Sequence, residues 1–294
     1  MHLLNKARNH PGFKKYAANA SWVMAEKILR MFMGLFVGIW VARYLGPEDF
    51  GLLSYAQSFV FLFVTIATLG LDGIVVRELV KNEAKRDVLI GTAFILKLIG
   101  AVVILPVLGV AVQLTSNDTL TNLIVFAIAS SAIFQSFNVI DFYFQAKVLS
   151  RYVTFANTIC LGLSSAIKII LIVQEAPLIA FAWMFLFEAF VLALGLVWFY
   201  KTSQDLKLID WKFDRSIANQ LLKDSWPLIL SGVLVSVYMK VDQVMINEMM
   251  GNYSVGQYAA AVKVSEAWYF IPMALCSSLF PALLNAKRHD EKLY

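Results

Sequence analysis

The chain of 294 residues is too apolar for a water-soluble domain, because 60% of its residues are hydrophobic and only 15% are charged. Soluble domains carry about a quarter charged residues. The formal charge of +5 does not indicate a nucleic-acid partner, since most of the positive charges lie in loops between apolar runs. The two cysteines, Cys160 and Cys276, lie inside apolar runs and the three histidines lie near the termini. Neither a disulfide framework nor a metal site is therefore predicted.

Eight apolar runs are long enough to cross a bilayer, which takes about 20 residues in an α-helix. Lipid offers the backbone no hydrogen-bond partner, so runs of this length predict helices. In chain order they cover roughly residues 17–42, 51–71, 89–112, 120–140, 153–173, 178–199, 226–247 and 257–280. The sequence therefore predicts an all-α integral membrane protein with about eight transmembrane helices.

Two short hinges divide the first pair and the last pair of runs. The first is Arg43–Ala56 and the second is Glu248–Ala261, at a constant offset of 205 residues. At this offset the identical pairs are Gly46 with Gly251, Gly51 with Gly256, and Ala56 with Ala261. An even number of runs separates the two copies, which gives them the same orientation in the membrane.

We infer an internal duplication whose second copy is incomplete. The predicted division is a six-helix lobe over residues 1–200, a cytoplasmic amphipathic linker over 201–225, and the first two helices of a second, parallel lobe over 226–294.

Positive charges outside the runs are distributed very unequally. All but one of these lysines and arginines lie in the N-terminal tail, the C-terminal tail, or the loops after the second, fourth and sixth runs; the exception is Arg43. By the positive-inside rule, both termini are predicted on the cytoplasmic side of the membrane. The opposite loops are very short and leave no room for a catalytic domain. We therefore expect a protein that is not an enzyme.

Six basic and four acidic residues lie inside the predicted runs, where each costs about 2.5–3.5 kcal/mol at the bilayer centre. Arg30 and Glu188 are central in their runs and must face protein or water. Lys168, Asp242 and Lys263 are nearer to an outer end, so their side chains have the alternative of extending to the lipid headgroups.

Helical spacing places some of these charges on polar faces. Asn19, Glu26 and Arg30 share one face of the first run, and further polar faces follow in the second, fourth, fifth and seventh runs. We expect these faces to line a shared, water-filled cavity. Two alternatives remain open: polar faces that only hydrogen-bond to neighbouring helices, and a Glu26–Arg30 pair that only compensates its own burial. The candidate cavity residues are Asn19, Glu26, Lys27, Arg30, Lys168, Glu188, Lys240 and Gln243.

The hinge sequence Tyr44–Leu52, followed by Leu69–Asp72 and Arg77–Glu78, resembles the N-terminal lobe of a transporter family. The same is true of Val241–Ile246 with Gly251, Val255–Ala259 and Ile271–Pro272. The family is that of the lipid-linked oligosaccharide flippases, the O-antigen and exopolysaccharide transporters of the multidrug/oligosaccharidyl-lipid/polysaccharide exporter superfamily.

The resemblance implies two six-helix lobes around a central cavity that opens alternately to either side. It implies a polyprenyl-pyrophosphate-linked oligosaccharide as cargo, with cationic cavity residues in the first and seventh helices, where this chain has Lys27, Arg30 and Lys240. The implied partners are membrane lipid, a polysaccharide polymerase and a chain-length regulator, without nucleic acid. No cofactor is implied, and H⁺ or Na⁺ is the expected coupling ion. Against this family the chain is expected to be truncated at its C-terminus.

The chemistry of the residues agrees with such a cargo, since a pyrophosphate needs cationic partners in a low-dielectric site and arginine matches phosphate oxygens in a bidentate geometry. One alternative is a multidrug cation antiporter of the same superfamily, whose cavity should be dominated by acidic residues. Another is a membrane enzyme such as a polysaccharide polymerase, which the short outer loops disfavour. A third, a non-transporting scaffold, would not need five polar faces.

Overall fold

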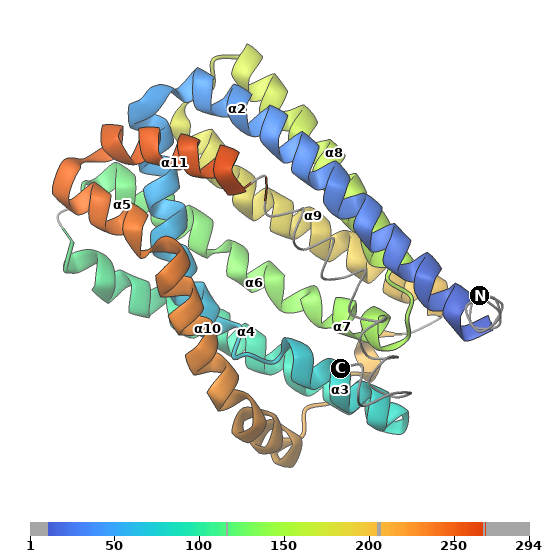
Figure 1. Cartoon of the computed structure of the whole chain (residues 1–294). Helices are drawn as coiled ribbons and strands as arrows, with labels where there is room; N and C mark the ends of the chain where they lie inside the picture. The colour runs from blue at the N-terminus through green and yellow to red at the C-terminus, as the bar shows by residue number, and fades with distance from the viewer. Residues whose placement is uncertain (1–10, 116, 205–206, 267, 269–294) are drawn as a thin grey trace, which may run out of the picture.

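The computed structural model describes residues 11–115, 117–204, 207–266 and 268, and these residues form helices without any strand (Figure 1). Short 3-10 turns, η1 to η3, connect some of the helices. The elements are α2 (Pro11–Ala67), α3 (Asp72–Lys81), η1 (Glu83–Lys85), α4 (Arg86–Gln113), α5 (Thr119–Ala129), α6 (Ser131–Gln135), η2 (Ser136–Asn138), α7 (Val139–Ala146), α8 (Arg151–Val173), α9 (Leu178–Gln204), η3 (Leu208–Asp210), α10 (Arg215–Met250) and α11 (Asn252–Glu266). The predicted all-α membrane architecture is confirmed.

Six helical stretches of the described chain are long and apolar enough to cross a membrane. The first of them, Ser21–Lys81, has 61 residues and would be about 90 Å long if straight, three times the thickness of a bilayer core. It therefore holds more than one crossing, in agreement with the two runs predicted there. Most of the last predicted run, 257–280, lies outside the described residues, so the total of eight crossings stays a prediction.

Both predicted hinges are sharp turns with the same backbone conformation. Gly46 kinks α2 with φ 71° and ψ 175°, and Gly251 separates α10 from α11 with φ 82° and ψ 176°. A positive φ of this kind is readily adopted only by glycine. Pro47 then starts the second half of α2, at a position where a helix needs no backbone N–H.

The two hinges pack against each other reciprocally. A Cβ atom on Gly51 would lie 1.8 Å from the carbonyl oxygen of Asn252, and a Cβ on Gly256 would lie 1.9 Å from that of Pro47. The offset of 205 residues relates Gly51 to Gly256 and Pro47 to Asn252, so each contact is the image of the other. Reciprocal contacts of this type are what a two-fold relation between equivalent surfaces produces.

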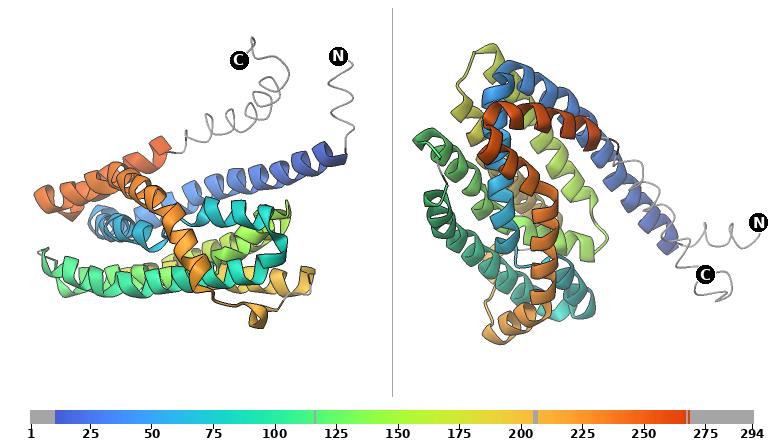
Figure 2. Two further views of the ribbon diagram at one scale, coloured as in Figure 1. Left: turned by 90° about the horizontal axis from the view of Figure 1, so that it is seen from below. Right: turned by 60° about the vertical axis from the view of Figure 1, so that its left-hand side comes forward.

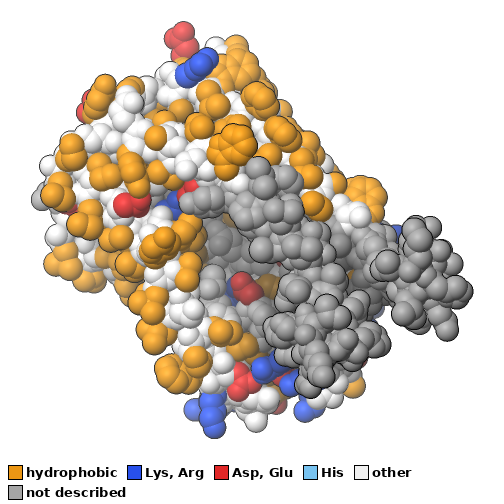
Figure 3. All heavy atoms as spheres, in the orientation of Figure 1, with side chains coloured by type: hydrophobic (Ala, Val, Ile, Leu, Met, Phe, Trp, Pro, Cys, Tyr) orange, Lys and Arg blue, Asp and Glu red, His pale blue; other side chains and the backbone are white. Residues whose placement is uncertain are grey.

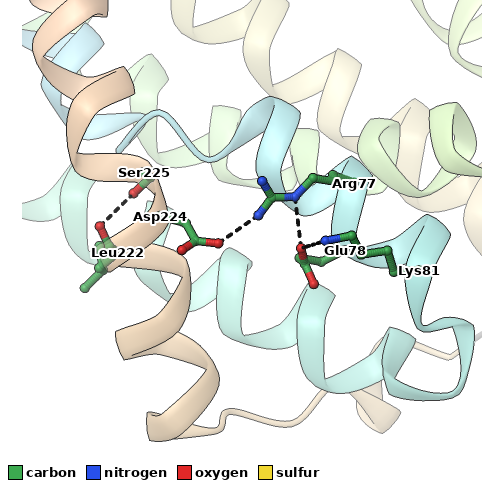
Figure 4. Close-up of polar contacts among 6 residues, drawn as sticks. All are labelled: Arg77, Glu78, Lys81, Leu222, Asp224 and Ser225. Carbon is green, nitrogen blue, oxygen red and sulfur yellow. Dashed lines mark hydrogen bonds and ion pairs between the residues drawn. The ribbon is translucent and has the colours of Figure 1, made fainter.

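The second half of α2 continues along α10, from the hinges toward the opposite end of the molecule (Figures 1 and 2). Its far end packs on α10 at Gly70, where an added Cβ would lie 3.0 Å from Leu228. Beyond that point Arg77 of α3 forms an ion pair of 2.7 Å with Asp224 of α10 (Figure 4). Both side chains are exposed, so this pair contributes no more than about 1 kcal/mol. Packing of α2 along α10, rather than the Arg77–Asp224 ion pair, therefore holds α10 against this part of the molecule.

The outer surface suits a bilayer. Hydrophobic side chains cover much of the visible face over α2, α8 and α10, while charged side chains gather mainly at its lower end and at the hinge end (Figure 3). Large exposed apolar residues are found on most of the long helices, for example Phe36, Val110, Trp198 and Tyr238. Lipid is the solvent that such a surface requires.

One predicted element differs from the structure. The fourth run is not a single helix but the series α5, α6, η2 and α7. It is interrupted at Ser130, whose hydroxyl donates a hydrogen bond of 2.7 Å to the carbonyl of Ala127. Such back-bonding by serine bends helices. The predicted linker 201–225 includes the start of α10 at Arg215, where the Asp214 side chain accepts a hydrogen bond from the backbone of Ile217. The place of this linker at the membrane surface stays a prediction.

The hinge contact predicts a position-specific effect of adding one methyl group. Gly51→Ala and Gly256→Ala should each destabilise the protein by about 1–3 kcal/mol, the usual cost of overpacking, because the added Cβ would overlap a carbonyl oxygen. Gly162→Ala is the matched control, since nothing lies within 4 Å of its Cβ position in α8; it should keep or raise stability. Thermal unfolding of the detergent-solubilised protein measures this. Equal effects at all three positions would contradict the packing.

Candidate functional site

Two cavities of the described chain share a wall. One, of about 480 Å³, lies between the second half of α2, α10 and α11 and is called the α10 arm. The other, of about 470 Å³, lies between the first half of α2, α8 and α9 and is called the α8 arm. Both volumes are typical of ligand sites. The residues lining both arms are Gln57, Ser131, Gln135, Phe185 and Lys263.

The α8 arm contains three of the predicted residues. Lys168 of α8 pairs with Glu188 of α9 at 2.6 Å, so this lysine does not extend to the headgroups. Arg30 lines the same arm, and its Nη2 and Nε atoms lie 2.6 Å and 2.7 Å from one oxygen of Glu26. The i, i+4 pair that was one of the alternatives for Glu26 and Arg30 is therefore formed, and Arg30 also lines the arm.

Burial shows how this Arg30–Glu26 pair is oriented. The side chain of Glu26 is only 8% exposed, whereas that of Arg30 is 52% exposed. Glu26 therefore holds the guanidinium from the protein side, while the rest of the group remains accessible from the α8 arm. Removing Arg30 alone would leave Glu26 as an uncompensated buried charge, which is strongly destabilising.

The α10 arm contains the other two predicted residues that the structure brings together. Gln243 is buried and accepts a hydrogen bond of 2.7 Å from the hydroxyl of Ser58. Lys240, one turn earlier on α10, has its ammonium 4.0 Å from Glu266 of α11. At that distance the pair is held by charge attraction without a direct hydrogen bond.

Lys263 of α11 borders both arms and is the site residue that sequence analysis missed. Its ammonium lies 4.8 Å from the centre of the Phe50 ring and 3.5 Å from the Cβ position of Gly38. Among the described residues, no carboxylate forms an ion pair with it. The repeat offset relates Lys263 to Ser58, which lies on the polar face of α2, and this correspondence is the signal that could have identified it.

Three of the predicted residues are not among the described residues that line the arms. Glu26 reaches the α8 arm only through its pair with Arg30. Lys27 is exposed and lines neither arm, and the side chain of Asn19 lies outside what the structure describes. A further buried lysine, Lys97, pairs with Asp72 at 3.2 Å in a third polar cavity of α3, α4 and α7. This cavity shares Asn138 with the α8 arm and no residue with the α10 arm.

Positively charged residues outnumber negatively charged residues in the lining of the arms. Four cations, Arg30, Lys168, Lys240 and Lys263, face two carboxylates, Glu188 and Glu266. Each of the two carboxylates already has a lysine partner, whereas Lys263 has none among the described residues. A low-dielectric cavity with this balance attracts an anion. Its hydroxyl and amide groups, such as Ser131 and Gln135, can donate and accept hydrogen bonds to a polar ligand.

Comparison with known proteins agrees with this architecture. A solved structure described as the inward-facing conformation of a multidrug resistance MATE family transporter of the MOP superfamily shares the fold with a TM-score of 0.61 and 20% sequence identity. The similarity covers 81% of this chain and 58% of the other, so the chain spans little more than half the length of that transporter. No match is found among curated proteins. The family model described as polysaccharide biosynthesis protein matches residues 16–287, and the chain therefore belongs to that family.

Proposed function

We propose that the protein is a transporter that moves a polyprenyl-pyrophosphate-linked oligosaccharide, an O-antigen or exopolysaccharide repeat unit, across the cytoplasmic membrane by alternating access. The family and the fold support a transporter of the MOP superfamily. The observation that supports the anionic lipid-linked substrate is the cation excess of the two arms, with Lys263 at their junction and without a carboxylate partner among the described residues.

In this proposal the pyrophosphate binds at the junction. Lys263 contributes a point charge from α11, and Arg30 contributes the part of its guanidinium that Glu26 leaves free. Lys168 and Lys240 remain paired with acidic residues and add positive potential at longer range. The glycan extends along the hydroxyl and amide groups shared by the arms, where Gln57, Ser131 and Gln135 supply hydrogen bonds.

A cation antiporter is the second candidate, because the similar solved structure is a multidrug transporter by its description. For that activity a carboxylate should face the cavity without a cationic partner. Glu188 and Glu266 instead have lysines at 2.6 Å and 4.0 Å. The charge balance of the described arms therefore favours the anionic cargo.

Lys263 gives the sharpest test of the anion site. Lys263→Gln should weaken binding of a polyprenyl-pyrophosphate oligosaccharide by roughly tenfold to a hundredfold, since a hydrogen bond to a charged group contributes about 1.5–3 kcal/mol. Lys201→Gln, an exposed position at the end of α9, is the matched control and should bind like the parent protein. Binding can be followed by native mass spectrometry in detergent. Unchanged affinity in Lys263→Gln would remove this residue from the site, and tight binding of an organic cation would support the antiporter.

The proposed membrane orientation places both termini, α3 and η3 in the cytoplasm, with the hinges and the α8–α9 turn outside. Cys160→Ser and Cys276→Ser would provide a background without thiols. A single cysteine at Gln174, exposed in the α8–α9 turn, should then react with a membrane-impermeant maleimide in intact cells, and one at the exposed Lys207 should react only after permeabilisation. The reverse pattern would invert the topology.

A further inference from the structure

A groove between the first half of α2 and α11 has no role in the site described above, although it ends at the same lysine. It encloses about 420 Å³, and its walls are mainly apolar, with Leu35 and Ile39 on one side and Ala260 and Val264 on the other. Of the residues that the structure describes, the charged ones that border it are Arg43, next to the hinge, and Lys263. The side chains of Ile39 and Val264 are 37% and 52% exposed, so the groove begins at the lipid-facing surface.

The internal repeat shows that this groove is not a general consequence of the packing. The offset of 205 residues relates Ala260 to Tyr55, and the groove to the contact between the second half of α2 and α10. There Tyr55 is 0% exposed, and its hydroxyl lies 3.2 Å from both Glu248 and Asn117. In the contact between the second half of α2 and α10, the space that corresponds to the groove is therefore filled by the aromatic side chain of Tyr55, whose hydroxyl is hydrogen-bonded.

Side-chain size differs at several equivalent positions. Ala260, Val264 and Gly38 beside the groove correspond to the larger Tyr55, Phe59 and Gln243, whereas Phe50 and Lys263 correspond to the smaller Val255 and Ser58. The glycines at the two hinges, Gly46 and Gly251, have the same backbone conformation. Unfilled apolar space in a protein forfeits the contacts that close packing would provide. An apolar ligand that occupies the groove would restore them.

Continuity with the arms identifies the chemistry of that ligand. Lys263 lines the α10 arm, the α8 arm and the groove. Along one path, a ligand would therefore meet polar groups, then an ammonium without a carboxylate partner among the described residues, then apolar walls leading to the membrane surface. A glycan, a phosphate and an apolar chain follow one another in the same order in a lipid-linked sugar.

We propose that the α2–α11 groove binds the isoprenoid units nearest to the phosphate of the lipid-linked substrate. This assignment rests on the proposed function and extends it, because the isoprenoid units next to the phosphate are bound by protein rather than left in the bilayer. Lys263 then lies at the boundary between the charged head group and the isoprenoid chain of the bound ligand. Closing the groove should remove the protein's contact with the isoprenoid chain and leave the head-group contacts in the arms.

The test uses the full chain in proteoliposomes and a polyprenyl phosphate that carries a diazirine on its second isoprenoid unit. After illumination, mass spectrometry should find the label on residues 35–50 and 256–264 of the parent protein. Ala260→Tyr, which installs the residue of the filled copy, and Ala42→Phe, on the opposite wall, should each lower this label at least tenfold. Ala166→Tyr, at an exposed position of α8 outside the cavities, should not.

Competition separates the possible occupants. Unlabelled polyprenyl phosphate should displace the probe, whereas excess phosphatidylglycerol should not. Labelling that persists in both Ala260→Tyr and Ala42→Phe, or that phosphatidylglycerol competes equally, would overturn the assignment and make the groove an ordinary lipid contact. The proposed function can fail separately: in that case inorganic pyrophosphate and the lipid-linked oligosaccharide would both bind independently of Lys263, whatever the groove variants show.

Discussion

The structure depends on the cost of placing charges within a membrane. Such a charge needs a partner or water, and the helices satisfy this need at a few shared places. Glu26 holds Arg30 within one helix, Glu188 holds Lys168 across α8 and α9, and Asp72 holds Lys97. Lys263 is the exception among the cavity cations, since no described carboxylate compensates it. In the proposed function an anionic ligand supplies the missing charge, which would link the stability of the site to its function.

The hinges determine where that site lies. Gly46 and Gly251 turn the chain in the same way, and the absence of side chains at Gly51 and Gly256 lets the two turns meet backbone to backbone. This contact brings α11 across the first half of α2 and α10 along its second half. The arms lie on the two sides of α2, so one kinked helix lines both. The groove lies where Ala260 stands at the position of the buried Tyr55 in the related contact.

Sequence reasoning predicted what depends on local patterns. Run length and apolarity predicted the helices, the glycines predicted the hinges, and spacing of four residues gave the Glu26–Arg30 pair as one of two alternatives. It did not place Lys263, because distance from the end of a run gives no information on which neighbouring helix a side chain faces. The Lys168–Glu188 pair and the interruption of the fourth run likewise depend on tertiary packing and on serine hydrogen bonds. The division into lobes and the number of crossings stay predictions.

In the proposed function, the cavity selects its cargo by the negative charge next to an isoprenoid chain. Translocation in proteoliposomes can be compared for two fluorescent lipids with the same chain and glycan, one joined by pyrophosphate and the other by a neutral ether. The protein should accelerate movement of the pyrophosphate lipid only, and Lys263→Gln should abolish the difference. Equal acceleration of both lipids, or movement of an organic cation in their place, would contradict the proposed function.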